Sequence, residues 1–174
     1  MTKPMTSIAV MQLVEQGKIE LDVPVSQYLP EFKDLMVLEE NTDGKFVEVP
    51  PKRPMTTRDL LRHTSGLTYG FFGNTEVDRR YQKAGLLVVD LNIEQTVSKL
   101  GKIPLLNHPG SKFVYSISAD VLGRLVEVAS GQLFDDYLKE NIFDPLEMQD
   151  TFFSVPEVKQ NRFAQLYAPA PGNP

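Results

Sequence analysis

The feature that most constrains this chain is a helical pattern of apolar residues between Ser116 and Ala129. Apolar side chains that recur every three or four positions lie on one face of a helix and favour burial of that face. One stripe consists of Ile117, Val121, Leu125 and Val128, and a second beside it of Leu122, Val126 and Ala129. Gly131 follows as the expected C-terminal cap. A helical core is therefore predicted.

Other segments repeat this helical signature, and only one segment has the pattern of strands. The further helices predicted are 5–14, buried on most sides and ended by Gly17; two short ones capped by Thr56 with Asp59 and by Thr75 with Asp78; 92–101; and 134–144, with the stripe Phe134, Leu138 and Ile142. Two β-prone runs within 36–49 flank Asp43 and Gly44, which predicts a small hairpin. We expect a predominantly α, α+β fold whose main sheet lies elsewhere.

Composition limits the classes of protein and site. The 174 residues are 41% apolar and 24% charged, so we expect residues 1–174 to form a single, partial domain. A net charge of -5 without a basic cluster argues against a nucleic-acid partner. Cysteine is absent, so thiolate ligands and cysteine nucleophiles are excluded. With only His63 and His108 as imidazoles, we expect neither a metal nor a cofactor.

The compartment is not fixed by the sequence. The N-terminus lacks the long apolar run of a signal peptide, and every apolar stretch is too short to span a bilayer. We therefore expect a soluble protein without a membrane span, in the cytoplasm or the periplasm.

Three segments in order resemble the serine β-lactamase-like and penicillin-binding-protein-like family, especially its esterase branch. They are MTKPMTSIAVMQLVEQGKI at the start, TTRDLLRHTSGL in the middle, and LLNHPGSKFVYS followed by ADVLGRLVEVASG. FDDYLKENIFDPLEM continues the likeness, which covers almost the whole chain. The resemblance implies part of the β-lactamase/transpeptidase-like fold, with most of its antiparallel sheet missing from an internal fragment.

Lys3 is the first candidate catalytic residue. In the family a serine opens a buried helix in a Ser-x-x-Lys motif, and Met1-Thr2-Lys3 resembles its last three residues. The resemblance places the nucleophilic serine directly before Met1. Residues three apart share a helix face, so the lysine amine can reach the hydroxyl. An amine that accepts a proton near neutral pH must be partly neutral, so we expect Lys3 in a desolvated site.

Tyr115 is the second candidate catalytic residue. It resembles the tyrosine of the family's Tyr-x-Asn element, which relays a proton toward the leaving group. Ile117 stands where the lactamase pattern has asparagine, which favours an esterase over a lactamase. The family's third element, a Lys-Thr-Gly or His/Trp-Gly-Gly strand, has no counterpart before Pro174.

Other polar residues have plainer interpretations. His63 and Ser65 are too close in sequence for attack geometry, and Ser65 lacks a Gly-x-Ser-x-Gly elbow, so HTSGL is interpreted as a structural turn. His108 has no second ligand at a metal-like spacing. The carboxylates at the ends of the helix near residue 140 fit capping and dipole effects, and these are Asp135, Asp136 and Asp144.

These residues favour a fragment of a serine hydrolase that cleaves a small carboxylic ester through an acyl-enzyme. The alternatives are a β-lactamase or D-amino-acid peptidase of the same family, with a β-lactam-like or amide substrate, and a non-catalytic helical interaction module. Because the nucleophile lies before Met1, we expect little turnover by this polypeptide alone. Helix faces meant for the absent sheet would be exposed, which predicts a homo-oligomer.

Overall fold

The computed structural model describes residues 2–86, 91–165 and 167. Its α-helices are α1 (Thr2–Glu15), α2 (Thr57–Leu61), α3 (Glu76–Ala84), α4 (Ile93–Leu100), α5 (Ser118–Ser130) and α6 (Phe134–Leu138). The strands are β1 (Val37–Glu40) and β2 (Phe46–Val49). Shorter helical turns are η1 (Val25–Gln27), η2 (Pro30–Phe32), η3 (Lys139–Phe143) and η4 (Glu157–Arg162). The predicted α+β, predominantly α class is confirmed.

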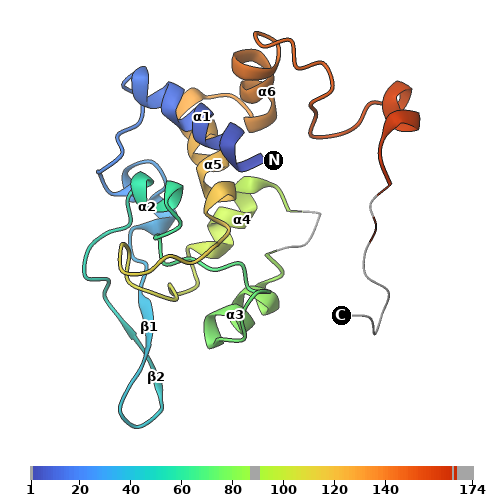
Figure 1. The fold of residues 1–174 in the computed structure, drawn as a ribbon. Coiled ribbons are helices and arrows are strands. Elements are labelled where there is room, and N and C mark those ends of the chain that lie inside the picture. Colours follow the sequence, from blue (N-terminus) through green and yellow to red (C-terminus); the bar gives the residue numbers. More distant parts are fainter. Residues whose placement is uncertain (1, 87–90, 166, 168–174) are drawn as a thin grey trace.

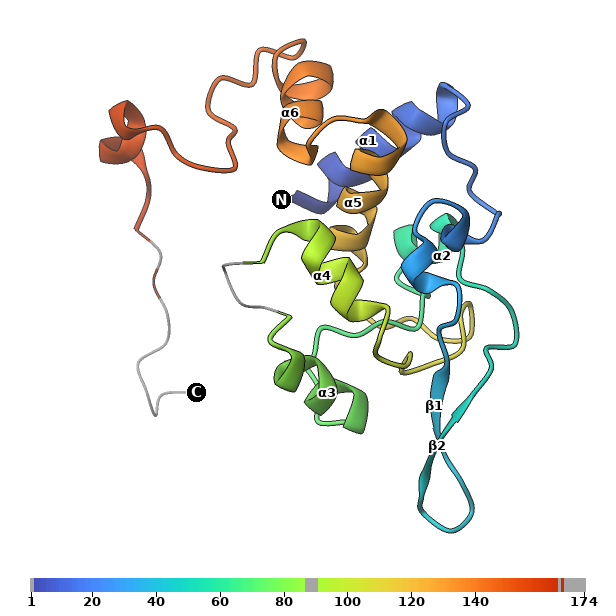
Figure 2. The ribbon, with the colours of Figure 1, turned by 180° about the vertical axis from the view of Figure 1, so that it is seen from behind.

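The centre of the molecule is the pair α1 and α5, which lie against each other in both Figure 1 and Figure 2. Ala9, Val10 and Leu13 of α1 are fully buried, as are Val121 and Leu125 of α5. Helices α4 and α6 pack on other sides of α5. Burial of this apolar surface is the main favourable contribution to folding.

Helix α1 is less enclosed than its sequence predicts. Its buried residues all belong to one face and are Thr6, Ala9, Val10 and Leu13. Ile8 is 44% exposed and Met11 41% exposed, and on α5 Val128 is 43% exposed. The prediction that α1 is buried on most sides is therefore wrong for this chain, because α5, α6 and η3 cover only part of the helix.

Helix starts follow the predicted capping pattern. Thr56 with Asp59, Thr75 with Asp78 and Asn92 with Gln95 each form a complete capping box, in which side chain and backbone exchange two hydrogen bonds. Gly85 and Gly131 end α3 and α5 in the left-handed conformation. The predicted caps at Thr56, Thr75 and Gly131 are confirmed, because each depends on residues close together in sequence.

The helix predicted over 134–144 is divided. Phe134, Leu138 and Ile142 are all buried, as the stripe requires. However, α6 ends at Leu138 and continues as the wider π-helical turn η3, in which the Asp144 N–H donates to the Lys139 carbonyl. Pro145 follows and has no N–H with which to extend the helix.

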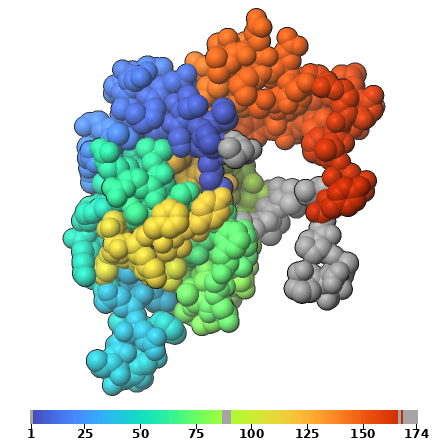
Figure 3. Space-filling model, viewed as in Figure 1, coloured from blue at the N-terminus to red at the C-terminus, as the bar shows by residue number. Residues whose placement is uncertain are grey.

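The hairpin forms as predicted, with Val37 opposite Val49 and Glu40 opposite Phe46 in an antiparallel pair. The side chain of Asn41 accepts hydrogen bonds from the backbone N–H groups of Asp43 and Lys45, which closes the turn. The hairpin, in cyan, and the part of the chain around η4, in red, both extend away from the helical body in Figure 3. Among the described residues, none of the helices has the length and apolar character needed to cross a bilayer.

Candidate active site

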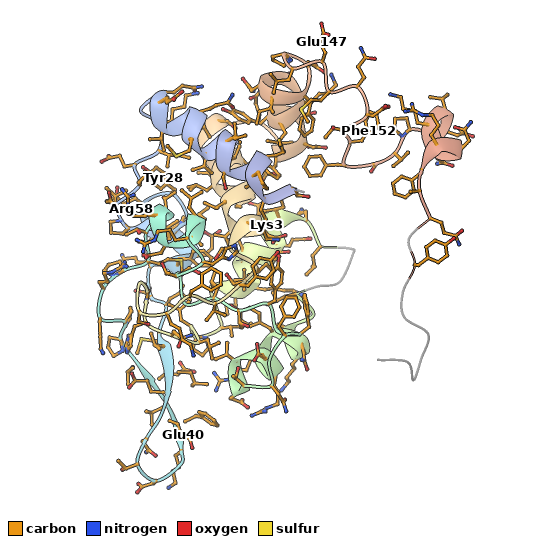
Figure 4. All side chains as sticks on the ribbon, viewed as in Figure 1. Lys3, Tyr28, Glu40, Arg58, Glu147 and Phe152 are labelled. Atoms are coloured by element: carbon orange, nitrogen blue, oxygen red, sulfur yellow. The ribbon has the colours of Figure 1, made fainter. Side chains whose placement is uncertain are left out.

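Lys3 and Tyr115, the two candidates from the sequence, lie side by side. Lys3 is in the first turn of α1, and Tyr115 is in the loop before α5. The Lys3 Nζ lies 4.6 Å from the centroid of the Tyr115 ring and 5.6 Å from that of Tyr69. Both distances fall within the range of cation–π contacts. Figure 4 shows Lys3 at the start of α1, far from Glu40 in the hairpin.

The charge on Lys3 depends on its phenol neighbours. Hydrogen bonding to Tyr115 raises the pKa of Lys3 above its ordinary value, and Tyr69 acts in the same direction, although burial opposes them. Lys3 is half-buried rather than enclosed. Within residues 1–174 the two phenols favour the charged form of Lys3 more than burial disfavours it. The expected desolvated site for Lys3 stays a prediction for the intact protein.

The His63 ring packs against the ring of Tyr115. The two rings lie 5.0 Å apart, and the His63 Nδ1 accepts a hydrogen bond from the Ser116 N–H at 3.2 Å. Because Nδ1 is an acceptor, the proton of the neutral ring is on Nε2. Burial lowers the pKa of His63, and the charge of Lys3 lowers it further, so the ring is neutral. His63 adopts a left-handed backbone with φ of 54°.

A chain of buried serine hydroxyls continues from His63. Ser116 Oγ lies 2.8 Å from Ser118 Oγ, which lies 2.9 Å from Ser65 Oγ. All three serines are at most 1% exposed. Ser65 Oγ also accepts a hydrogen bond from the Leu67 N–H at 3.3 Å. Ser65 is therefore bonded within the fold rather than to His63, in agreement with HTSGL as a structural turn.

A cavity of about 430 Å³ opens beside Lys3. Its lining residues are Thr2, Lys3, Thr6, Tyr69, Ile93, Ala119, Asp120, Phe134 and Phe153. Burial against the cavity wall raises the pKa of Asp120, and the charge of Lys3 partly offsets this effect. The sequence did not single out Tyr69 or Asp120. Asp120 lies within a helical pattern that gives no sign of a site, and Tyr69 lies in a loop that has no recognisable motif.

The family assignment rests on a match over the full chain. A family profile described as Beta-lactamase matches residues 1–174. This chain belongs to the beta-lactamase family. The predicted family is thereby confirmed, and the fold is the predominantly helical part of the β-lactamase/transpeptidase-like fold.

Relatives in the beta-lactamase family include named esterases. Esterase EstB of Burkholderia gladioli is 35% identical over 169 residues, covering 95% of this chain and 40% of EstB. Lovastatin esterase of Penicillium rubens is 33% identical over 174 residues, covering 99% of this chain and 43% of the esterase. The solved structure of EstCE1, a hydrolase with promiscuous acyltransferase activity, superposes with a TM-score of 0.70 at 33% identity, covering 84% of this chain and 36% of EstCE1. The chain spans about two fifths of the length of the curated relatives it matches.

Other residues considered from the sequence have local roles in this member of the beta-lactamase family. The His108 Nε2 lies 2.8 Å from Glu39 Oε1, and its Nδ1 accepts a hydrogen bond from the Lys52 N–H. Asp135 and Asp136 lie in the first turn of α6, and Asp144 pairs with Lys139. In the part of the chain that the structure describes, no three His, Asp or Glu side chains gather to hold a metal ion.

Proposed function

We propose that this chain is part of a serine hydrolase that cleaves carboxylic esters through an acyl-enzyme. The observation that carries the proposal is the contact between Lys3 and Tyr115, with Nζ 4.6 Å from the ring centroid. These residues lie far apart in the sequence, and both resemble positions of the family's catalytic motifs. Membership in the beta-lactamase family and the named esterase relatives support the same activity.

The proposed nucleophile is a serine directly before Met1. That position is three residues before Lys3, which is about one turn of a helix. The N-terminus of a helix carries partial positive charge, which favours negative charge on an attacking oxygen. The Lys3 side chain lies at the same end of α1.

In the proposed reaction, Lys3 and Tyr115 share the transfer of one proton. The serine proton passes to this pair while the serine oxygen forms a bond to the ester carbonyl carbon. Tyr115 then gives the proton to the leaving alkoxide as the ester C–O bond breaks. Water repeats the sequence on the acyl-enzyme and releases the carboxylic acid.

Ile117 supports an ester over a β-lactam as the substrate. It occupies the position where the lactamase pattern has asparagine, and it is 2% exposed at the start of α5. An isoleucine has no amide with which to bind the polar side chain of a β-lactam. The proposed substrate class is therefore a small carboxylic ester.

The test measures hydrolysis of a chromogenic acetate ester by the intact protein that contains this segment. We expect Lys3→Ala and Tyr115→Phe each to lower kcat/KM by at least about 100-fold, the range of a lost acid–base group. The matched controls are Lys45→Ala in the hairpin turn and Tyr28→Phe, whose hydroxyl accepts a hydrogen bond from the Glu20 N–H. Figure 4 shows Tyr28 away from Lys3.

The controls should retain activity within about twofold, because both positions lie outside the proposed site. Equal activity in all four variants and the unsubstituted protein would remove Lys3 and Tyr115 from the mechanism. Absence of hydrolysis in the unsubstituted protein would contradict the ester-hydrolase proposal and favour a non-catalytic module.

A further inference from the structure

Two neighbouring phenylalanines are exposed beside the proposed reaction centre. Phe71 is 53% exposed and Phe72 is 68% exposed, and their ring centroids lie 4.2 Å apart. We call Phe71 and Phe72 the phenylalanine pair. Adjacent exposed aromatic rings form an apolar patch, and such patches commonly mark binding sites.

The phenylalanine pair is continuous with the candidate active site. The Tyr69 ring lies 5.1 Å from Phe71, 5.8 Å from Phe72 and 5.4 Å from Tyr115. Phe72 itself lies 6.0 Å from the Tyr115 ring, with which Lys3 is in contact. Phe72 and Tyr115 therefore border one continuous aromatic surface.

The loop that carries the pair is fixed on its N-terminal side by Gly70. Its φ is 82°, and an added Cβ would lie 2.7 Å from the Tyr81 Cβ. The Gln82 side chain donates a hydrogen bond to the Gly70 carbonyl at 2.6 Å. These contacts hold the backbone before Phe71 tightly against α3.

The same loop is fixed on its C-terminal side by Asp78. A Cβ at Gly73 would lie 2.5 Å from Asp78 Oδ2, and the Thr68 hydroxyl donates to Asp78 Oδ1 at 2.7 Å. Asp78 also accepts from the Thr75 N–H and hydroxyl. The backbone before and after the phenylalanine pair is therefore held against α3. The conformation of this loop leaves the two rings exposed.

We propose that Phe71 and Phe72 bind an apolar group of the ester substrate, which makes the enzyme selective for esters with an aryl or long alkyl substituent. This inference rests on the proposed function and specifies its substrate class. A substituent of this kind buries apolar surface against the two rings, and an aromatic one gains stacking as well. The small groups of an ester such as ethyl acetate can bury less apolar surface against these rings.

The test compares three esters in the intact protein by titration of the released acid. Ethyl acetate has small groups on both sides, ethyl 3-phenylpropanoate has a phenyl group on the acyl side, and 3-phenylpropyl acetate has it on the alcohol side. Phe72→Ala should lower kcat/KM about tenfold for at least one phenyl ester and less than about twofold for ethyl acetate. The ester affected identifies which side of the substrate lies on the pair.

The matched control is Phe46→Ala, since Phe46 is 50% exposed in the hairpin, away from Lys3. It should leave all three rates unchanged. The inference is overturned if Phe72→Ala changes the rates for all three esters equally, or if it changes none of them. No change is also the result expected if another part of the intact protein covers the phenylalanine pair. Failure of the unsubstituted protein to hydrolyse ethyl acetate overturns the proposed function, and this inference with it.

Discussion

Two different regions adjoin Tyr115. On its buried side, polar side chains are hydrogen-bonded to one another, whereas on its open side aromatic rings are exposed to solvent. On the buried side, His63 and Ser116 connect to further serines that are at most 1% exposed. On the open side, Tyr115 is 44% exposed and Phe72 68% exposed. A buried polar group that loses its partner costs stability, whereas an exposed ring can be removed at small cost.

The difference indicates a division of roles. The buried side fixes the position of Tyr115 beside Lys3, and the open side is available to substrate. Substitutions on the buried side should therefore lower the free energy of unfolding, and those on the open side should alter activity alone. Substitutions in the intact protein test this division.

Gly66→Ala should have the largest effect on stability. Gly66 has a φ of 89°, and an added Cβ would lie 2.1 Å from the backbone oxygen of Asn107. The backbone cannot move easily, because the Leu106 N–H donates a hydrogen bond to the Gly66 carbonyl. We expect the free energy of unfolding to fall by more than about 3 kcal/mol in urea denaturation.

The control for Gly66→Ala is Gly17→Ala. Gly17 has a φ of 70° but no atom within 4 Å of an added Cβ, so only the cost of a left-handed alanine applies. That cost is about 1–2 kcal/mol. If Gly66→Ala proved no less stable than Gly17→Ala, the turn that contains Gly66 would not be tightly packed.

Asp59→Asn should have the next largest effect. Asp59 is 3% exposed, caps α2, pairs with Arg53 through both oxygens and accepts a hydrogen bond from the Thr64 hydroxyl. We expect a loss of about 2 kcal/mol in the same unfolding measurement. Asp22→Asn is the control, because Asp22 forms a similar two-oxygen pair with Arg58 on the surface.

The surface pair of Asp22 should contribute much less than the Asp59 interactions, because solvent screens an exposed ion pair. Equal losses in Asp59→Asn and Asp22→Asn would show that burial does not strengthen the Asp59 interactions.

Acid should destabilise the fold through the buried carboxyls of Asp59 and Asp78. Burial alone would raise the pKa of each carboxyl, but hydrogen bonds from Arg53 and Thr56 to Asp59, and from Thr75 and Thr68 to Asp78, outweigh it and lower both pKa values. An unfolded aspartate titrates near about 3.9. The stabilisation is therefore present above about pH 4 and is lost as pH falls through the lower folded values.

Thermal melts between pH 7 and pH 2 measure this acid effect. Asp59→Asn should flatten the decline in Tm below about pH 4, because one of the two carboxyls no longer titrates. An unchanged acid profile in Asp59→Asn would exclude Asp59 as a source of acid instability.

Phe72→Ala should have the smallest effect on stability. Its ring is mostly exposed, and its loop is held by Gly70, Gly73 and Thr68 rather than by the ring. We expect the free energy of unfolding to change by less than about 0.5 kcal/mol. A loss above about 1.5 kcal/mol would mean that the phenylalanine pair is part of the structural framework rather than a free binding surface.

The sequence predicts features that depend on near neighbours. The capping boxes of Asp59 and Asp78 and the turn at Gly44 follow rules that span three or four residues. The contact of Lys3 with Tyr115 was expected from a resemblance to a family. Apolar periodicity alone does not connect two residues so far apart in the chain.

Contacts between distant segments account for what the sequence missed. The chain of Ser65, Ser116 and Ser118 joins two loops through hydroxyls, which have no distinctive sequence spacing. The exposure of Ile8 and Met11 depends on how much of α1 its neighbours cover, which α1 alone does not reveal. Two expectations remain predictions. One is that residues 1–174 form a single partial domain, and the other is that exposed helix faces lead to self-association.

The most direct test of the account is covalent labelling of the intact protein with a fluorophosphonate, in which a serine oxygen displaces fluoride from phosphorus. Peptide mass spectrometry should place the adduct on a serine directly before Met1, and Lys3→Ala should slow its formation at least about 100-fold. An adduct on Ser65 or on another serine, or labelling at an unchanged rate in Lys3→Ala, would contradict a reaction centre formed by Lys3 and Tyr115.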